Sequence, residues 1–564
     1  MHSLFNHYQV LRNIVSELDS NIDRLCFSLT CRQLFASREL YLRFKPSPPF
    51  KVDADELLNF IHTLKLYKSM LSQSTANVDC WIRVEDVPSY CTTLDFAYDK
   101  RTRDMSKIPS HIHTLFLKGT DNFMHGILPT SITRLKLDMH SLPLLAPSVA
   151  AGAALTVLNI RYHGHLPPHY IPSSVTTLKL RCPEVRMGDI SHSVTLSSDH
   201  ISVASGVTPT SVTHLSFTRH LVGPLSEGVI PASVTWLYLR EFTVTKDIHL
   251  PTSITTLTIG KVNCIRPVPI PSSVTDLTFA NEFNSVIRLI PASVRTLRFG
   301  ALFDQSLEGM LPSSLTHLGI NNPSYPCHLT SQTIPSSVTS LDLGFRRTPL
   351  VHGFIPGSVT SLTLNTQHLV LTHGLIPPSV TRLTFFGSSI STPLVTGWIP
   401  PSVTSLAFDC SVRYNRDAIP ASTTMLRFGH NYFVSQPLSE SVIPPTITSL
   451  DIAFDSSDVP MELSPRVIPE SVAELTISYP TFDALGDADL HVLSQLQCLK
   501  VVNSFCLEAF ETIVWIFKST PLTSITFTID KECLIFRQLV VRKLDKNHTI
   551  FLSDFQFSGL LSLH

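Results

Sequence analysis

The chain has 564 residues and a formal net charge of −1, with 43% of its residues apolar and 15% charged. One compact hydrophobic core rarely grows to this length, so we expect several domains or one elongated array. The composition excludes a disordered acidic or basic protein, and the neutral charge gives no argument for nucleic acid or a membrane surface as the partner.

Residues 8–44 have the apolar spacing of short helices. Apolar side chains recur at helical intervals at Val10, Leu11, Ile14, Val15 and Leu18, and a second apolar run covers residues 25–32. Residues 45–49 (K-P-S-P-P) are a short linker. Asp53 and Glu56 then have the spacing of a capping box, which predicts a second helix. Its apolar face contains Leu57, Leu58, Ile61 and Leu64.

Between Pro88 and Pro469 one unit recurs, with the pattern I-P-x-S-V-T-x-L-x-[LFI]. Clear copies surround Pro172 and Pro231, and degenerate copies lie near Pro147 and Ser191. About nineteen units give a mean period of about 21 residues, which matches leucine-rich repeats and is too short for a helical hairpin. Proline fixes φ and lacks an N–H, so we expect it in a turn before each strand, with the later serine bonded to nearby backbone.

Each unit predicts one short β-strand. Leu237 and Leu239 of one copy point to the same side, because side chains alternate along a strand. One strand cannot bury this side alone, so neighbouring units must stack into a parallel sheet with a continuous core. We therefore expect a mainly β fold: a curved leucine-rich-repeat-like solenoid of about nineteen short parallel strands, with a small helical N-terminal segment and a mixed C-terminal cap. The short period predicts extended or 3₁₀ segments, rather than helices, opposite the strands.

Residues 480–564 lose the period. A helix is predicted by Leu507, Phe510, Val514 and Phe517, and a strand by Ile525, Phe527 and Ile529. We interpret this region as a cap, which the open edge of a sheet needs. The predicted domains are a helical segment over residues 1–45, a linker and capping helix over 46–80, the repeat solenoid over 81–480 and a C-terminal capping region over 481–564.

The repeat resembles the FNIP repeat, a relative of the leucine-rich repeat. The fuller FNIP pattern starts with F-N before I-P-x-S-V-T-x-L, and Phe283 and Asn284 before Pro291 fit it. Phe303 with Asp304, and Phe433, are weaker copies. The resemblance covers about two-thirds of the chain and implies a solenoid that binds other macromolecules and catalyses no reaction.

The N-terminal run LDSNIDRLCFSLTCRQLF, residues 18–35, resembles the F-box-like segments that precede FNIP repeats. This resemblance implies docking to the adaptor subunit of a cullin-type ubiquitin ligase, with Ile14, Leu18, Leu25 and Leu29 as the adaptor-binding residues. The repeats would then bind the substrate. The alternative is a helical cap that shields the first repeat of a binding scaffold with no role in ubiquitin transfer.

The sequence has no catalytic or cofactor-binding motif, so we expect no enzyme, no cofactor and no metal. The group that most resembles a metal site is His163, His165 and His169, which we interpret as a polar loop. The 11 cysteines form no CxxC pair, which indicates reduced thiols in the cytoplasm. The first ten residues lack a basic region followed by an apolar run, so we expect no secretory signal.

Residues that flank the strand leucines point to the concave side of the predicted sheet. In the early repeats this concave face is basic and ends in an aromatic pair, and we predict that it binds a partner through Lys118, Arg134, Lys136, Arg161, Lys179, Arg181, Trp236, Tyr238 and Arg240. Trp, Tyr and Arg are enriched at binding hot spots. We expect an acidic protein as partner, neither nucleic acid nor membrane, and a monomeric chain. The alternative is a solvated face whose charges only prevent aggregation.

Overall fold

The computed structural model describes the repeats and the C-terminal region in separate stretches. The described residues are 11, 15, 74–76, 91–96, 103–104, 108–119, 124–125, 128–139, 154–162, 171–180, 200–201, 210–222, 225, 227–244, 248–264, 267–325, 333–344, 352–365, 372–390, 393–413, 415, 417–429, 443–453, 467–502, 509–528, 538–544, 546, 548–553 and 558–562. Within them the chain forms two compact units. Unit 1 contains Met1–Asn77, Val87–Leu94 and Thr423–His564, and unit 2 contains Val78–Asp86 and Asp95–Ser422.

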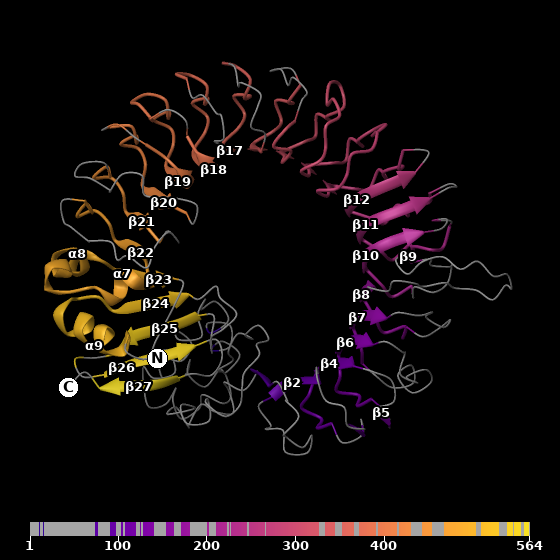
Figure 1. Cartoon of the computed structure of the whole chain (residues 1–564), viewed down its shortest axis with the longest axis horizontal. Helices are drawn as coiled ribbons and strands as arrows, with labels where there is room; N and C mark the ends of the chain where they lie inside the picture. Colours follow the sequence, from indigo (N-terminus) through magenta and orange to yellow (C-terminus); the bar gives the residue numbers. More distant parts are fainter. Residues whose placement is uncertain are drawn as a thin grey trace. The chain divides into compact units, whose positions relative to one another are not determined.

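Unit 2 is a parallel-strand solenoid, which confirms the predicted fold class. Each strand of its main ladder pairs in parallel with the next, so the coils stack side by side with their strands at the same edge (Figure 1). The strands are β4 (Thr114–Gly119), β6 (Arg134–Met139), β7 (Val157–Tyr162), β8 (Thr177–Leu180), β10 (His214–Val222), β11 (Trp236–Val244), β12 (Thr256–Cys264), β13 (Asp276–Phe279), β14 (Thr296–Phe299), β15 (His317–Ile320), β16 (Ser340–Leu343), β17 (Ser361–Asn365), β18 (Arg382–Ser389) and β19 (Ser405–Ser411).

Short strands accompany this ladder. β9 (His200–Ile201) pairs with the second half of β10, and β3 (Arg103–Asp104) pairs with β5 (Met124–His125). Because β8 pairs directly with β10, the degenerate unit near Ser191 adds no strand between them, contrary to the sequence-based expectation. The described connections of unit 2 contain turns and extended segments and no helix, as the short period predicts.

The turn before each strand follows the expected proline chemistry. The carbonyl of Pro271 accepts a hydrogen bond of 3.1 Å from the N–H of Val274, which closes the turn three residues later. Val274, Leu277 and Phe279 are then at most 2% exposed. The alternation of buried and half-buried residues along β13 matches the L-x-x-L-x-L reading of the sequence.

The serine of most described units links two coils, whereas Ser131 Oγ in the Pro129 unit is buried without a hydrogen-bond partner. Ser273 Oγ donates a hydrogen bond of 2.6 Å to the carbonyl of Ile254, which lies 19 residues earlier in the preceding coil. The sequence predicted a bond to backbone close in the chain, and this part of the prediction is wrong, because the partner belongs to the preceding coil. The same bond, of 2.6–3.0 Å, recurs at Ser211, Ser233, Ser253, Ser293, Ser314, Ser337, Ser358, Ser379, Ser402 and Ser422.

Replacing Ser273 with alanine is expected to lower the free energy of unfolding by about 1 kcal/mol, because the Ile254 carbonyl loses a partner. Ser272 is the matched control, since it occupies the same turn and is exposed. Urea unfolding followed by circular dichroism measures both variants. Equal loss of stability in Ser272→Ala and Ser273→Ala would show that the bond between coils contributes nothing.

Stacked aromatic rings fill the core between β13 and β15. Phe279 and Phe299 lie 5.3 Å apart between ring centroids, and Phe303 lies 4.1 Å from Phe299 and 6.2 Å from Tyr325. The F-N pair that marks the FNIP pattern belongs to this stack. Phe283 is 2% exposed, while Asn284 Oδ1 accepts a hydrogen bond of 3.2 Å from the N–H of Asp304 in the next coil. Phe433, the other copy, lies outside the described residues.

Unit 1 contains the last repeats and the predicted cap. The helix predicted around Phe510 and the strand predicted around Phe527 are confirmed as α9 and β24. β20 to β24 are parallel, whereas β25, β26 and β27 continue as antiparallel strands, which the sequence did not predict. The elements of unit 1 are β1 (Ser74–Ala76), β2 (Cys91–Phe96), β20 (Met425–Phe428), β21 (Ser449–Asp451), β22 (Glu474–Ser478), α7 (Tyr479–Asp483), η5 (Asp487–Asp489), α8 (Leu490–Gln495), β23 (Cys498–Val502), α9 (Ala509–Ser519), β24 (Ser524–Thr528), β25 (Gln538–Lys543), β26 (His548–Ser553) and β27 (Ser558–Ser562). The last two residues of β2 belong to unit 2.

At the N-terminus, Leu11 and Val15 are helical and at most 3% exposed. The predicted adaptor-binding residues Ile14, Leu18, Leu25 and Leu29 lie outside the described residues, as does the helix predicted after Asp53. The predicted domain limits stay predictions. No helix in the described part of the chain is long and apolar enough to cross a membrane.

Candidate protein-binding surface

The outward side chains of neighbouring strands in unit 2 form two parallel rows. Strand pairing in register aligns them, because residues that face each other across a ladder lie side by side. We call these two rows on β6, β7, β8, β10 and β11 the strand face. The first row is Arg134, Val157, Thr177, His214 and Trp236, and the second row is Lys136, Asn159, Lys179, Ser216 and Tyr238.

The structure thus brings five of the predicted partner-binding residues together. Arg134 and Lys136 are exposed, while Lys179, Trp236 and Tyr238 are half-buried. Arg161 on β7 and Arg240 on β11 are exposed two residues beyond the second row. Lys118 belongs to β4, and Arg181 lies outside the described residues.

The positive charges of this region differ in their partners. Arg161 forms an ion pair of 3.3 Å with Asp138 on the neighbouring strand, so its charge is partly neutralised. Lys136 Nζ lies 5.2 Å from the ring centre of Phe116, a cation–π distance. Within the described residues no carboxylate lies at ion-pairing distance from Arg134, Lys136 or Lys179.

The next strands of unit 2 show the contrast. Lys261 on β12 pairs with Glu241 on β11 at 3.0 Å, and Arg298 on β14 approaches Asp276 on β13 at 3.7 Å. Opposite charges on neighbouring strands of this sheet therefore form ion pairs. The described residues around Arg134, Lys136 and Lys179 provide no such carboxylate.

An aromatic group occupies the β10–β11 end of the strand face. The rings of His214 and Trp236 are stacked with centroids 6.2 Å apart, and Trp236 and Tyr238 are stacked at 6.4 Å. Burial raises the pKa of Tyr238, Arg240 lowers it, and the nearby carboxylate of Glu282 raises it. The phenol therefore stays protonated at neutral pH and can donate a hydrogen bond.

Sequence reasoning missed His214 as part of this group. The signal was present, because His214 holds the same position in the Pro209 unit that Trp236 holds in the next unit. A single histidine in one unit of the sequence gives no reason to assign it to an aromatic group. Only the stacking geometry assigns it to the surface.

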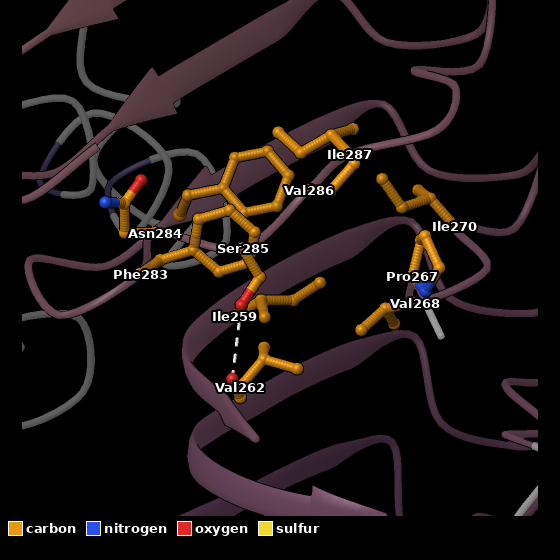
Figure 2. Close-up of a pocket in the computed structure, with 11 residues that line it drawn as sticks. Ile259, Val262, Pro267, Val268, Ile270, Phe283, Asn284, Ser285, Val286 and Ile287 are labelled. Carbon is orange, nitrogen blue, oxygen red and sulfur yellow. Dashed lines mark hydrogen bonds between the residues drawn. The ribbon is translucent and has the colours of Figure 1, made fainter. Parts of the chain in front are cut away.

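A separate apolar pocket of about 260 Å³ lies among the turns after β12 and β13 (Figure 2). Ile259, Val262, Pro267 and Phe283 contribute to its lining, and Ser285 Oγ closes one side through a hydrogen bond of 3.1 Å to the Val262 carbonyl. No acid, base or nucleophilic thiol is present among its described lining residues. The pocket therefore offers shape and apolar contact, without groups for catalysis.

In the described part of the chain, no group of three or more His, Cys, Asp or Glu side chains could hold a metal ion. His163, His165 and His169 lie outside the described residues. The arrangement of cations and aromatic rings on the strand face is suited to holding another molecule.

The fold defines a leucine-rich-repeat-like solenoid whose strand face carries cations and stacked aromatic rings. Two stretches, residues 303–346 and 370–411, match the family model of the FNIP repeat. These stretches include the Phe303 copy of the pattern and several of the serine-linked coils. No curated protein matches the chain.

Three solved structures are similar to this chain. CroV588, described as a novel circular LRR protein, is 21% identical with a TM-score of 0.47, and the match covers 76% of this chain and 65% of that protein. YopM from Yersinia enterocolitica WA-314 is 16% identical with a TM-score of 0.33, covering 73% and 85% of the two chains. TLR13, in its complex with ssRNA13, is 13% identical with a TM-score of 0.36, covering 74% and 78%.

Proposed function

We propose that this protein is a non-enzymatic binding protein whose strand face holds an acidic region of another protein. The observation that carries the proposal is the set of three cations, Arg134, Lys136 and Lys179, with no described acidic partner, beside stacked aromatic rings. Complementary charge guides encounter and register, and aromatic rings supply contact area at low entropic cost.

A triple charge reversal tests this function. Arg134→Glu, Lys136→Glu and Lys179→Glu together are expected to abolish capture of the proteins that the wild-type chain retains, because like charges across an interface repel. The matched control reverses three exposed arginines elsewhere in unit 2: Arg288, Arg382 and Arg413. Affinity capture with quantitative mass spectrometry measures both, and unchanged circular dichroism confirms folding. Equal capture by the wild type and the strand-face variant would contradict the proposal.

The finer role that we propose is the substrate-recognition subunit of a cullin-type ubiquitin ligase, working in the cytoplasm. Support comes from the F-box-like run at residues 18–35 and from Leu11 and Val15, which are helical and buried as in a packed helix. The free thiol of Cys498 agrees with a reducing compartment. The alternative remains a binding scaffold whose N-terminal helices only cap the repeats.

Binding to the purified ligase adaptor separates these two roles. We expect the full-length chain to capture the adaptor and a chain lacking residues 1–45 to lose it. A second variant, Leu18→Asp with Leu25→Asp, keeps the segment while removing apolar contacts. If the full-length chain captures no adaptor, the ligase role is wrong and the scaffold alternative holds.

A further inference from the structure

The spacing along the second row of the strand face is regular. Lys136 on β6 and Lys179 on β8 are separated by one strand, which carries Asn159. Lys179 and Tyr238 on β11 are again separated by one strand, which carries Ser216. Neighbouring strands lie about 4.8 Å apart, so these three side chains start at intervals of about 9.6 Å. Figure 1 shows β6, β7, β8, β10 and β11 in this order along unit 2.

A polyproline II segment matches this interval. It has three residues per turn and rises about 3.1 Å per residue, so every third side chain returns to the same side after about 9.3 Å. In an extended β-strand, side chains on one side recur at about 6.6 Å or 13 Å, and in an α-helix the seventh residue returns after about 10.5 Å. The polyproline II interval is the closest of these to the spacing on the strand face.

Along the second row, the chemistry of these three side chains changes. Lys136 and Lys179 are cations, whereas Tyr238 belongs to the stacked aromatic group and has Glu282 nearby. An acidic side chain fits the first two positions, and an apolar ring fits the third, where it can stack on the group of Trp236 and Tyr238. Asn159, between the lysines, has both donors and an acceptor for the exposed backbone of a polyproline II chain.

We propose that the strand face binds an acidic polyproline II segment of the partner, lying across the strands, with acidic residues three positions apart and an apolar ring three positions further. This inference rests on the proposed function and specifies its ligand. Polyproline II segments lose little entropy on binding and dock against aromatic surfaces elsewhere.

The test is fluorescence anisotropy of the full chain with two labelled peptides of identical composition. The matched peptide has aspartate at its first and fourth positions, phenylalanine at its seventh and proline between them. The control peptide has its aspartates at the first and third positions, where they point to different sides. We expect the matched peptide to bind at least about tenfold more tightly, since misplaced charges lose their partner.

Two single variants assign the binding to the strand face. Lys179→Glu is expected to weaken binding of the matched peptide at least about tenfold. Arg382→Glu, an exposed position on β18 that aligns with the first row, should leave it unchanged. A helical peptide with aspartates seven positions apart provides the competing geometry. Tighter binding of that peptide would overturn the polyproline II proposal.

The remaining outcomes separate this proposal from the proposed function. If both peptides bind with equal affinity and Lys179→Glu weakens the binding of both, the proposed spacing is wrong and the acidic-partner function is still supported. Absence of peptide binding, with capture still lost in the triple variant, overturns the ligand class alone. If neither peptide binding nor protein capture responds to strand-face variants, both proposals fail.

Discussion

Replacing Phe303 with alanine is expected to lower the free energy of unfolding by about 3–5 kcal/mol. The ring of Phe303 is fully buried and stacks on Phe299 at 4.1 Å, on Tyr325 at 6.2 Å and on Phe283 at 6.4 Å. Alanine would therefore leave a cavity bordered by three coils. Because each coil contacts only its neighbours, the loss should also increase local opening around β13 to β15.

Leu302 provides the control, because it is the adjacent residue and is 58% exposed. Leu302→Ala should change stability by less than about 0.5 kcal/mol. Urea unfolding gives the global effect, and amide hydrogen exchange shows whether protection is lost first in the coils of β13 to β15. Similar stabilities for the two variants would mean that the aromatic stack is not a stabilising core.

Gly260→Ala is expected to destabilise unit 2 by at least about 2 kcal/mol, because an added Cβ has no space. That atom would lie 1.7 Å from the carbonyl oxygen of Arg240 and 2.6 Å from its carbonyl carbon. Both belong to the backbone of the neighbouring strand, so β11 and β12 would have to separate. The change should also weaken binding at the strand face, since Tyr238 and Trp236 lie on the displaced β11.

Gly319→Ala is the matched control for this variant. Gly319 lies within β15, and an added Cβ there would meet the side chain of Arg298 at 3.5 Å, an ordinary contact. Alanine should be neutral or slightly stabilising there, since glycine weakens a strand interior. Thermal unfolding of both variants measures the difference, and tolerance of Gly260→Ala would contradict the close approach of β11 and β12.

The parts of the fold that depend on repetition could be predicted from the sequence. A constant period fixes which residues face each other in neighbouring coils. The sequence could therefore predict the burial of Leu237 and Leu239 and the alignment of Arg134 with Trp236 in one row. Non-repeating features gave no such signal. The antiparallel strands β25 to β27 and the direct pairing of β8 with β10 depend on contacts that no periodic pattern encodes.

The charges of the surface were predicted less well than its position. Arg161 was counted as available for a partner, but its geometry pairs it with Asp138. Whether two side chains on neighbouring strands meet depends on rotamers, which the sequence does not specify. Lys118 and Arg181 stay predictions, since the side chain of the first and the whole of the second lie outside what the structure describes.

The same serine hydrogen bond joins successive coils in the same way. Ser293 bonds to Val274 at 2.7 Å and Ser314 bonds to Val294 at 2.8 Å, so the joint before a coil is chemically the same as the joint after it. Removing or duplicating a whole coil would reproduce that joint without a new contact. Adding or removing one coil would therefore change the length of the strand ladder by about 4.8 Å, one strand at a time.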